Sequence, residues 1–286
     1  MNKVTNSVFQ QQEVVNDYFQ SRSLHWKDIY TSGGVHSEII RDRHAAVLAW
    51  IDSLALAPGS SVLEVGCGAG FMAVALAQRE FRVHAIDSSD AMIKQARCNA
   101  AEAGLTDQVS LDIGDVYALA FDDGFFDLVI AIGVIPWLER PDLAIQELSR
   151  VARPGGHVIL TTANRAGLVS YFDPWRNPAL EPLKQGVKKM FERVGLHQRS
   201  PSMSFHNSYF VDKSLSRVGL AKLRGMTHGF GLSFHHHAII PEPLGTRLHH
   251  RLQRLADRNL PGFRSIGMAY FVLARKTVTL ERHPEA

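Results

Sequence analysis

The stretch Ser61–Asp87, SVLEVGCGAGFMAVALAQREFRVHAID, decides how the rest of the chain folds. An apolar run comes first, followed by three closely spaced glycines, an alanine-rich helical pattern and a second β-type run that ends in Asp87. Glycine tolerates unusual backbone angles and lets a ligand approach the main chain, and a helix that starts behind such a turn directs free N–H groups at that ligand. Asp87 stands 21 positions after Gly66, at the predicted tip of the second strand. A carboxylate at that place can accept both hydroxyls of a ribose, so the stretch predicts a site for a nucleoside.

The segment Glu64–Gly70 reads E-x-G-x-G-x-G, and with Asp87 it resembles the class I S-adenosylmethionine-dependent methyltransferases. The spacing differs from the wider G-x-G-x-x-G of most nicotinamide enzymes, and the presence of strand, helix and acid together disfavours an ordinary tight turn. The resemblance implies an α/β fold with a Rossmann-like, doubly wound, seven-stranded sheet whose last strand is antiparallel. It also implies S-adenosylmethionine as cofactor and S-adenosylhomocysteine as product. The cofactor-binding residues that it implies are Glu64, Gly66, Cys67, Gly68, Gly70, Asp87, Ser88, Met92, Asp115, Val116 and Ile132.

Two later runs extend the resemblance. Phe126–Ile132 is a near-continuous apolar run, typical of a parallel strand covered on both faces. The residues that follow it, Gly133–Trp137, are similar to the family motif that lines the meeting place of donor methyl and acceptor. Family members that methylate amino groups of DNA bases carry Asp or Asn, two prolines and an aromatic residue there, so this sequence disfavours that reaction. The run Leu148–Leu160, L-x-R-V-x-R-P-G-G-x-V-I-L, resembles the small-molecule and lipid branch, which includes ubiquinone- and menaquinone-type enzymes.

The order of these patterns predicts six segments. Ligands of a doubly wound sheet lie at the carboxyl ends of its strands, and two insertions of this chain leave from such ends. We therefore expect the insertions to form a cap over the substrate, and the second one to contain a basic helix over Thr246–Arg258. The segments are N-terminal helices and lid 1–57, S-adenosylmethionine-binding core 58–163, cap insertion 164–210, core 211–227, cap insertion 228–263, and last core strand with tail 264–286.

Aromatic and imidazole side chains are the candidates for the acceptor site. The pattern YF…W..IY…H over residues 18–36 resembles the start of magnesium-protoporphyrin O-methyltransferases, and in the wider family such additions fold back over the cofactor. The alternative is that these side chains seal the helices onto the core. The substrate-binding candidates are Tyr18, Trp26, Tyr30 and Trp137. The candidate general bases are His36 and His228, with His206 and one of the three histidines of His235–His237 as further candidates.

The run His235–His237 does not predict a metal site. Three successive imidazoles cannot all face one ion from a strand or helix, and no Cys, Asp or Glu stands nearby at metal-ligand spacing. Cys67 lies in the glycine turn and Cys98 in a helical pattern, which indicates neither a disulfide framework nor a metal centre. We therefore expect no bound metal.

The charge is unevenly distributed along the chain. Residues 1–163 carry 12 Lys and Arg against 20 Asp and Glu, whereas residues 164–258 carry 15 against 6. The second half could be a solvated basic surface, or it could face an anionic acceptor or an anionic membrane surface. A nucleic acid is disfavoured because the basic residues are scattered and no binding module is recognised. The apolar runs are too short for a membrane span and the start has no cleavable-signal pattern, so we expect a cytoplasmic protein.

These observations predict a methyltransferase that uses S-adenosylmethionine and acts on a small or lipid-like acceptor, at oxygen. Two alternatives stay open. One is an RNA or protein methyltransferase that uses the basic second half. The other is a non-catalytic module that binds S-adenosylmethionine.

Overall fold

The fold is taken from a computed structural model of the chain. It describes residues 3–21, 28–30, 32–168, 171, 177, 180, 182–184, 186, 203–231, 233–234, 237–238 and 241–278. Trp26 and most of the first cap insertion lie outside these ranges.

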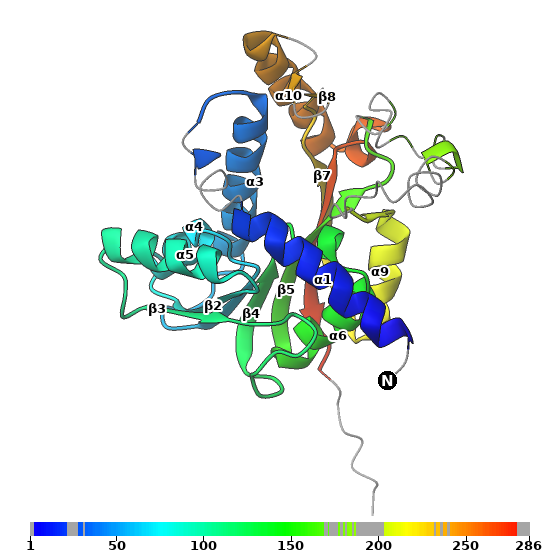
Figure 1. Cartoon of the computed structure of the whole chain (residues 1–286). Coiled ribbons are helices and arrows are strands. Elements are labelled where there is room, and N and C mark those ends of the chain that lie inside the picture. Colours follow the sequence, from blue (N-terminus) through cyan, green and yellow to red (C-terminus); the bar gives the residue numbers. More distant parts are fainter. Residues whose placement is uncertain are drawn as a thin grey trace, which may run out of the picture.

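A single mixed sheet forms the centre of the molecule, with strand order β3-β2-β1-β4-β5-β10-β7 (Figure 1). All of these strands are parallel except β10, which is antiparallel to both of its neighbours. The predicted doubly wound sheet with an antiparallel last strand is confirmed, and a short strand β6 pairs with the end of β5 as an addition. The strands are β1 Ser61–Val65, β2 Arg82–Asp87, β3 Val109–Ile113, β4 Phe126–Ala131, β5 Ala152–Asn164, β6 Phe205–His206, β7 Leu220–His228 and β10 Ala269–Lys276. A separate hairpin joins β8 Ser233–Phe234 to β9 His237–Ala238.

Helices cover both faces of the sheet and bury two apolar clusters against it. One face packs on α3 Val35–Asp52, α4 Phe71–Ala77 and α5 Asp90–Glu102. The other packs on α6 Pro141–Val151 and α9 Ser208–Arg217. The central strands are apolar on both sides because both faces are covered, as the run at β4 predicts.

The remaining helices lie at the carboxyl edge of the strands or across it. They are α1 Lys3–Ser21, the short helix η1 Ile135–Trp137, α10 Glu242–Asp257 and the short helix η3 Phe263–Ser265. The basic helix expected from Thr246 begins four residues earlier, at Glu242, because Pro243 stands in its first turn. A proline is tolerated there, since the first N–H groups of a helix have no partner within it.

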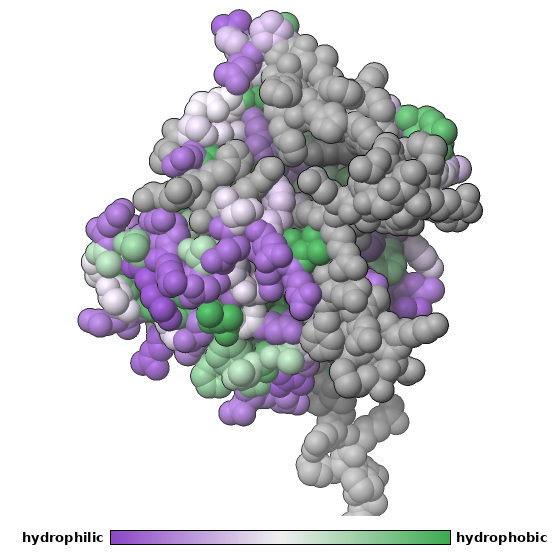
Figure 2. All heavy atoms as spheres, viewed as in Figure 1, coloured by the Kyte–Doolittle hydropathy of each residue, from purple (hydrophilic) through white to green (hydrophobic). Residues whose placement is uncertain are grey.

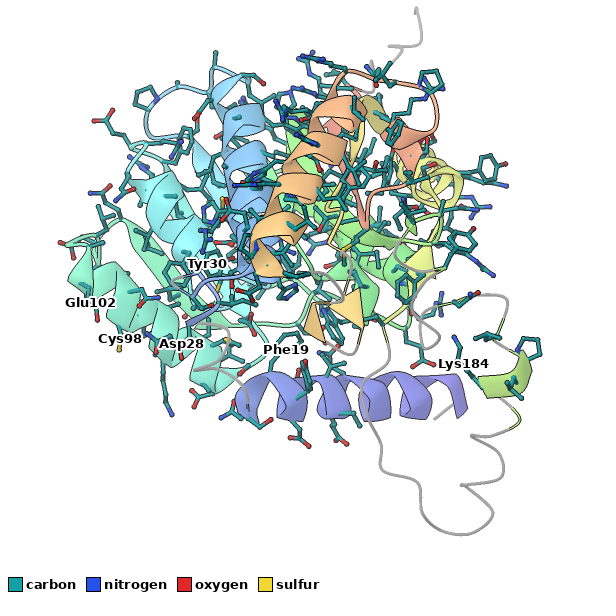
Figure 3. The ribbon with its side chains drawn as sticks, turned by 90° about the horizontal axis from the view of Figure 1, so that it is seen from above. Phe19, Asp28, Tyr30, Cys98, Glu102 and Lys184 are labelled. Atoms are coloured by element: carbon teal, nitrogen blue, oxygen red, sulfur yellow. The ribbon has the colours of Figure 1, made fainter. Side chains whose placement is uncertain are left out.

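Pairing in the sheet fixes where the two insertions leave the core. Ala269, at the start of β10, pairs with Ala163 near the end of β5 and with His228 at the end of β7. Both insertions therefore begin at the carboxyl edge. From above, α10 and α3 lie side by side over the sheet, while α1 runs along one side of it (Figure 3).

Candidate active site

The glycine turn between β1 and α4 is fastened to the end of β2. The N–H groups of Gly66 and Cys67 donate to the carbonyl of Ile86 at 2.8 and 3.0 Å. Gly66 has a φ of +69°, and a Cβ on it would lie 2.3 Å from Val134 Cγ2. Gly68 also has a positive φ, of +53°, but a Cβ on it would meet nothing within 4 Å. The first glycine is therefore required by packing, whereas the second keeps open the space above the turn.

Asp87 is held in one orientation by backbone N–H groups. Its Oδ2 accepts a hydrogen bond from the N–H of Gly68 and its Oδ1 accepts one from the N–H of Ser89, each at 2.9 Å. Burial raises the pKa of Asp87, and these two hydrogen bonds act in the opposite direction. Because a carboxylate oxygen can accept more than one hydrogen bond, both oxygens keep capacity for a ligand's hydroxyls.

Glu64 lies at the floor of the same turn and is 5% exposed. Burial, and then the charge of Asp87, raises its pKa to about 8, although a hydrogen bond from the Ala73 N–H opposes the shift. Its Oε2 is buried and has no hydrogen-bond partner among the described residues. A buried polar atom of this kind costs free energy unless it is paired, so it marks a place where a polar ligand group fits.

The residues implied for the adenine side gather where β2 and β3 end next to each other. Val116 is buried, and Asp115 is exposed with its Oδ1 accepting the N–H of Tyr117 at 2.9 Å. Met92 is buried in the first turn of α5, where its N–H donates to the side chain of Ser89 at 3.4 Å. Ile132 follows β4 and is half-buried. The structure thus brings the predicted cofactor set to one edge of the sheet.

Helix α1 is tied to the loop that follows β2. Asn16 Oδ1 accepts a hydrogen bond from the hydroxyl of Ser88 at 2.7 Å. Gln20 Oε1 accepts two, from the hydroxyl of Ser89 at 3.0 Å and from the N–H of Ala91 at 3.2 Å. The last two turns of α1 therefore lie beside the acid that we expect to bind ribose.

The same helix also reaches the motif after β4. The ring centroid of Trp137 lies 5.7 Å from that of Tyr18 and 5.2 Å from that of Phe19. Tyr30 instead packs on Phe71, the first residue of α4, with 4.4 Å between the ring centroids. Tyr18 and Trp137 thus meet at the edge where an acceptor would lie, whereas Tyr30 covers the start of the helix behind the glycine turn.

Comparison with known proteins agrees with this geometry. The sequence model of a family described as a methyltransferase domain matches residues 63–160, which span β1 to β5. Residues 63–160 are a class I S-adenosylmethionine-dependent methyltransferase domain. The match covers the glycine turn, Asp87 and the motif after β4, and it leaves α1, α3 and α10 outside.

Relatives of the methyltransferase domain differ in the atom that their names give as acceptor. A ubiquinone biosynthesis O-methyltransferase of Paracidovorax citrulli is 37% identical over 119 residues, 41% of this chain and 50% of its own length. A norajmaline N-methyltransferase of Rauvolfia serpentina is 33% identical over 135 residues, 47% of this chain and 44% of its own. The chain thus spans about half the length of these curated relatives.

The likeness to solved structures reaches beyond the methyltransferase domain. The magnesium protoporphyrin IX methyltransferase of Synechocystis PCC 6803, solved with bound S-adenosylhomocysteine, superposes with a TM-score of 0.63 over 93% of this chain and 100% of that one. The sequence identity is 20%, so the likeness establishes the fold.

Arg43 lies beside the turn after β4 and is a candidate site residue that the sequence analysis did not name. Its Nη1 lies 3.5 Å from the position that a Cβ on Gly133 would take, directly after β4. The guanidinium is half-buried, and no described residue forms a hydrogen bond or an ion pair with it. The sequence did contain a pattern that could have identified Arg43. It stands four residues after Ile39 and four before Val47, and this spacing puts a charged side chain on the buried side of an amphipathic helix.

Three of the candidate bases lie in different surroundings. His36 is exposed in the first turn of α3. His228 is 3% exposed beneath α3, where its Nε2 bonds the carbonyl of Ile39 at 3.2 Å and burial lowers its pKa to about 4. His206 is half-buried on β6 beside the end of β5, and its Nε2 has no hydrogen-bond partner among the described residues. This burial favours a packing role for His228, while His206 stands at the carboxyl edge of the sheet, beside the end of β5.

The described residues include one group with ligand atoms close enough for a metal ion, formed by Asp42, His249 and His250. His249 Nδ1 accepts the N–H of Phe230 at 3.2 Å, so the proton of the neutral ring must be on Nε2. That Nε2 lies 3.0 Å from Asp42 and donates to it. The nitrogen that a metal would need is therefore occupied by a proton, and the group joins α10 to α3 through hydrogen bonds. Among the residues of the expected histidine loop, His235 and His236 lie outside the described ranges.

Among the described residues, no helix combines the length and the apolar character that crossing a bilayer requires.

Proposed function

We propose that this protein transfers a methyl group from S-adenosylmethionine to an oxygen atom of a small-molecule acceptor. The observation that carries the proposal is the paired geometry at the glycine turn. Asp87 is oriented by two N–H groups, and Glu64 presents an unpartnered buried oxygen below the open space at Gly68. A nucleoside with a charged amino-acid arm fits both features.

Each part of the cofactor would meet a different residue of this chain. Asp87 would bind the ribose hydroxyls, with Val116 beside the adenine ring. Glu64 would face the ammonium group of the methionine arm, and Arg43 its carboxylate, because both side chains lie around Gly66 and Gly133 at the ends of β1 and β4. The sulfonium of S-adenosylmethionine supplies an activated methyl group that already carries its leaving group.

The protein's contribution is to hold the acceptor in line with that methyl group and to exclude water. Helix α1 supports this role because its last two turns both bind the Ser88–Ala91 loop and pack on Trp137. Tyr18 and Trp137 would then line the acceptor side. An oxygen acceptor of high pKa needs a base, and His206 suits it because burial lowers its pKa and keeps the ring neutral.

The acceptor proposal is tested with a methyl-labelled donor. Purified protein is incubated with labelled S-adenosylmethionine and a panel of phenols, carboxylic acids, amines and porphyrins, and the labelled bond is identified by mass spectrometry. Transfer to an oxygen acceptor supports the proposal. Transfer to nitrogen only would show that the acceptor atom is nitrogen and would overturn the oxygen assignment. The proposed cofactor site would not be affected by that result.

Replacing Asp87 with alanine is expected to weaken binding of S-adenosylmethionine, S-adenosylhomocysteine and 5′-methylthioadenosine to a similar degree. All three carry the ribose, and loss of charge-assisted hydrogen bonds costs about 1.5–3 kcal/mol, or roughly 10- to 150-fold in Kd. Calorimetric titration measures the three affinities. Asp112→Ala is the matched control, because Asp112 is an exposed carboxylate on the neighbouring strand β3. Unchanged affinity in Asp87→Ala would remove this residue from the site.

Replacing Arg43 with methionine is expected to weaken binding of S-adenosylhomocysteine by about 10-fold or more and to leave 5′-methylthioadenosine unaffected. The second ligand lacks the amino-acid arm, so the difference isolates the carboxylate contact. Methionine keeps the apolar part of the side chain inside the helix packing. The control is Arg82→Met, since Arg82 is exposed at the start of β2, at the opposite edge of the sheet. An equal loss for both ligands would show that Arg43 acts through the fold.

A further inference from the structure

Helix α10 presents four arginines on its outward face. Arg247, Arg251, Arg254 and Arg258 follow one another at spacings of four, three and four residues, and all four are exposed. The opposite face of the helix is buried, through Gly245, His249, Gln253 and Ala256. The arginines therefore form one continuous row along the side that points away from the protein.

A row of leucines borders the arginines along one side. Leu244 is 56% exposed, and Leu248 and Leu255 are half-buried. On a helical projection these three positions lie next to Arg251 and Arg258 and away from His249. The outer surface of α10 is thus amphipathic in itself, with a basic row beside an apolar one.

The charges of this row are not neutralised within the described part of the chain. None of the four arginines forms an ion pair with a described residue, and Arg254 makes only a hydrogen bond through its Nε to the carbonyl of His250. Of the acids of the helix, Glu242 lies beside Gly34, directly before α3. Asp257 stands three residues after Arg254, forms no ion pair with a described residue, and its Oδ1 accepts a hydrogen bond from Gln253.

The helix that carries the row is firmly attached. His249 joins Asp42 of α3 at 3.0 Å and receives the Phe230 N–H at 3.2 Å, and Gln253 Oε1 receives the Gly229 N–H at 3.1 Å. In Figure 1, α10 stands at the top of the molecule, beyond the carboxyl ends of the strands, and Figure 2 shows hydrophilic side chains gathered there. The surface is therefore fixed and lies on the same side of the molecule as the candidate active site.

We propose that the outer face of α10 binds an anionic membrane surface. Arginines attract the headgroups of acidic lipids, and a flanking row of leucines enters the boundary between headgroups and acyl chains. A nucleic-acid surface would use the arginines but would give the exposed leucines no apolar environment. Helix α10 has no Phe, Tyr or Trp on which a base could stack, and the ring nitrogen of its His250 faces the acids Glu38 and Asp42 of α3. This arrangement would hold the mouth of the active site toward the bilayer.

Vesicle co-sedimentation of the full chain tests the proposal. Vesicles of phosphatidylcholine alone are compared with vesicles that also contain about one third phosphatidylglycerol, a composition that makes the surface strongly anionic. We expect binding to the anionic vesicles only. The double change Arg247→Glu and Arg251→Glu should weaken it by about 30-fold, because each basic residue at such a surface is worth roughly a fivefold change in affinity.

Two matched controls test whether vesicle binding depends on where the arginines and the leucine lie, and not only on the net charge or on the number of exposed apolar residues. Arg82→Glu with Arg217→Glu changes the net charge equally at exposed sites on β2 and α9, and should leave binding within about twofold, since these sites lie away from the membrane-facing row. Leu244→Ser should weaken vesicle binding several-fold, whereas Leu223→Ser should not, because Leu223 is 54% exposed on β7 and away from the row. Equal effects of the two charge pairs would overturn the proposal. Arginine-dependent binding of a 20-nucleotide RNA without vesicle binding would also overturn it.

The inference goes beyond methyl transfer. The vesicle assay contains no S-adenosylmethionine, so Asp87→Ala should bind vesicles as the unchanged chain does. Failure of either proposal therefore leaves the other standing.

Discussion

Replacing Gly66 with alanine is expected to lower the free energy of unfolding by about 2–5 kcal/mol, while the same change at Gly68 lowers it by only about 1–2 kcal/mol. Both glycines have positive φ, so both variants carry backbone strain. Only the Cβ on Gly66 also collides with a neighbour, Val134 Cγ2. Gly68→Ala should therefore fold, yet bind S-adenosylhomocysteine poorly, because its Cβ fills the space above the turn. Chemical denaturation and calorimetric titration measure the two effects separately.

A second change at Val134 tests whether the collision is the cause. In the double variant Gly66→Ala with Val134→Ala the methyl group that collides is gone, while the strain at φ +69° remains. The double-mutant cycle should then show a favourable coupling of about 1–3 kcal/mol between the two positions. Gly68→Ala combined with Val134→Ala serves as the control and should be additive. Additive effects of Gly66→Ala and Val134→Ala would mean that the turn shifts to accommodate the added methyl group, so that the collision with Val134 is not the cause of the lost stability.

The features of this fold that could be predicted from the sequence are those with causes that act over a few neighbouring residues. The Glu64–Gly70 turn needs glycine for reasons of backbone angle and close packing, and the run at β4 is apolar because helices cover both faces of the sheet. Such causes act within a few residues or within one element, so they leave a pattern. The doubly wound sheet and its antiparallel last strand, β10, followed from the family resemblance that this pattern supports.

The contacts that complete the site could not be predicted in this way, because they join segments that are distant in sequence. Asn16 and Ser88 are 72 positions apart, and nothing near either residue indicates the other. Arg43 reaches Gly133 because α3 packs across the end of β4, and that packing depends on the whole sheet. The burial of His228 likewise depends on α3 covering the end of β7, since Ile39 supplies its hydrogen-bond partner.

Glu64 is expected to make the stability of the cofactor-free protein fall as the pH rises from about 5 to 8. The pKa of its carboxyl is about 8 in the folded chain, against an ordinary value of 4.5, so folding takes up a proton in this interval. The stabilisation is complete below the unfolded pKa and is lost as the pH rises through the folded one, with an upper limit of about 5 kcal/mol. Glu64→Gln mimics the protonated acid and should remove this slope in urea denaturation at several pH values. Glu102→Gln, at an exposed position of α5, should keep the slope.

The same proton links the site to its cofactor. An ammonium group placed against Glu64 favours the ionised carboxylate, so binding of S-adenosylhomocysteine near pH 7 should release close to one proton and should tighten by up to about tenfold per pH unit between 6 and 8. Calorimetry in buffers of different ionisation enthalpy counts the protons. 5′-Methylthioadenosine has no ammonium group and should release none. Glu64→Gln should abolish the release that accompanies S-adenosylhomocysteine binding. Proton release that persists in Glu64→Gln would assign it to another group, and Glu64 would then be a structural acid below the turn, buried beside Asp87 and kept protonated by its surroundings.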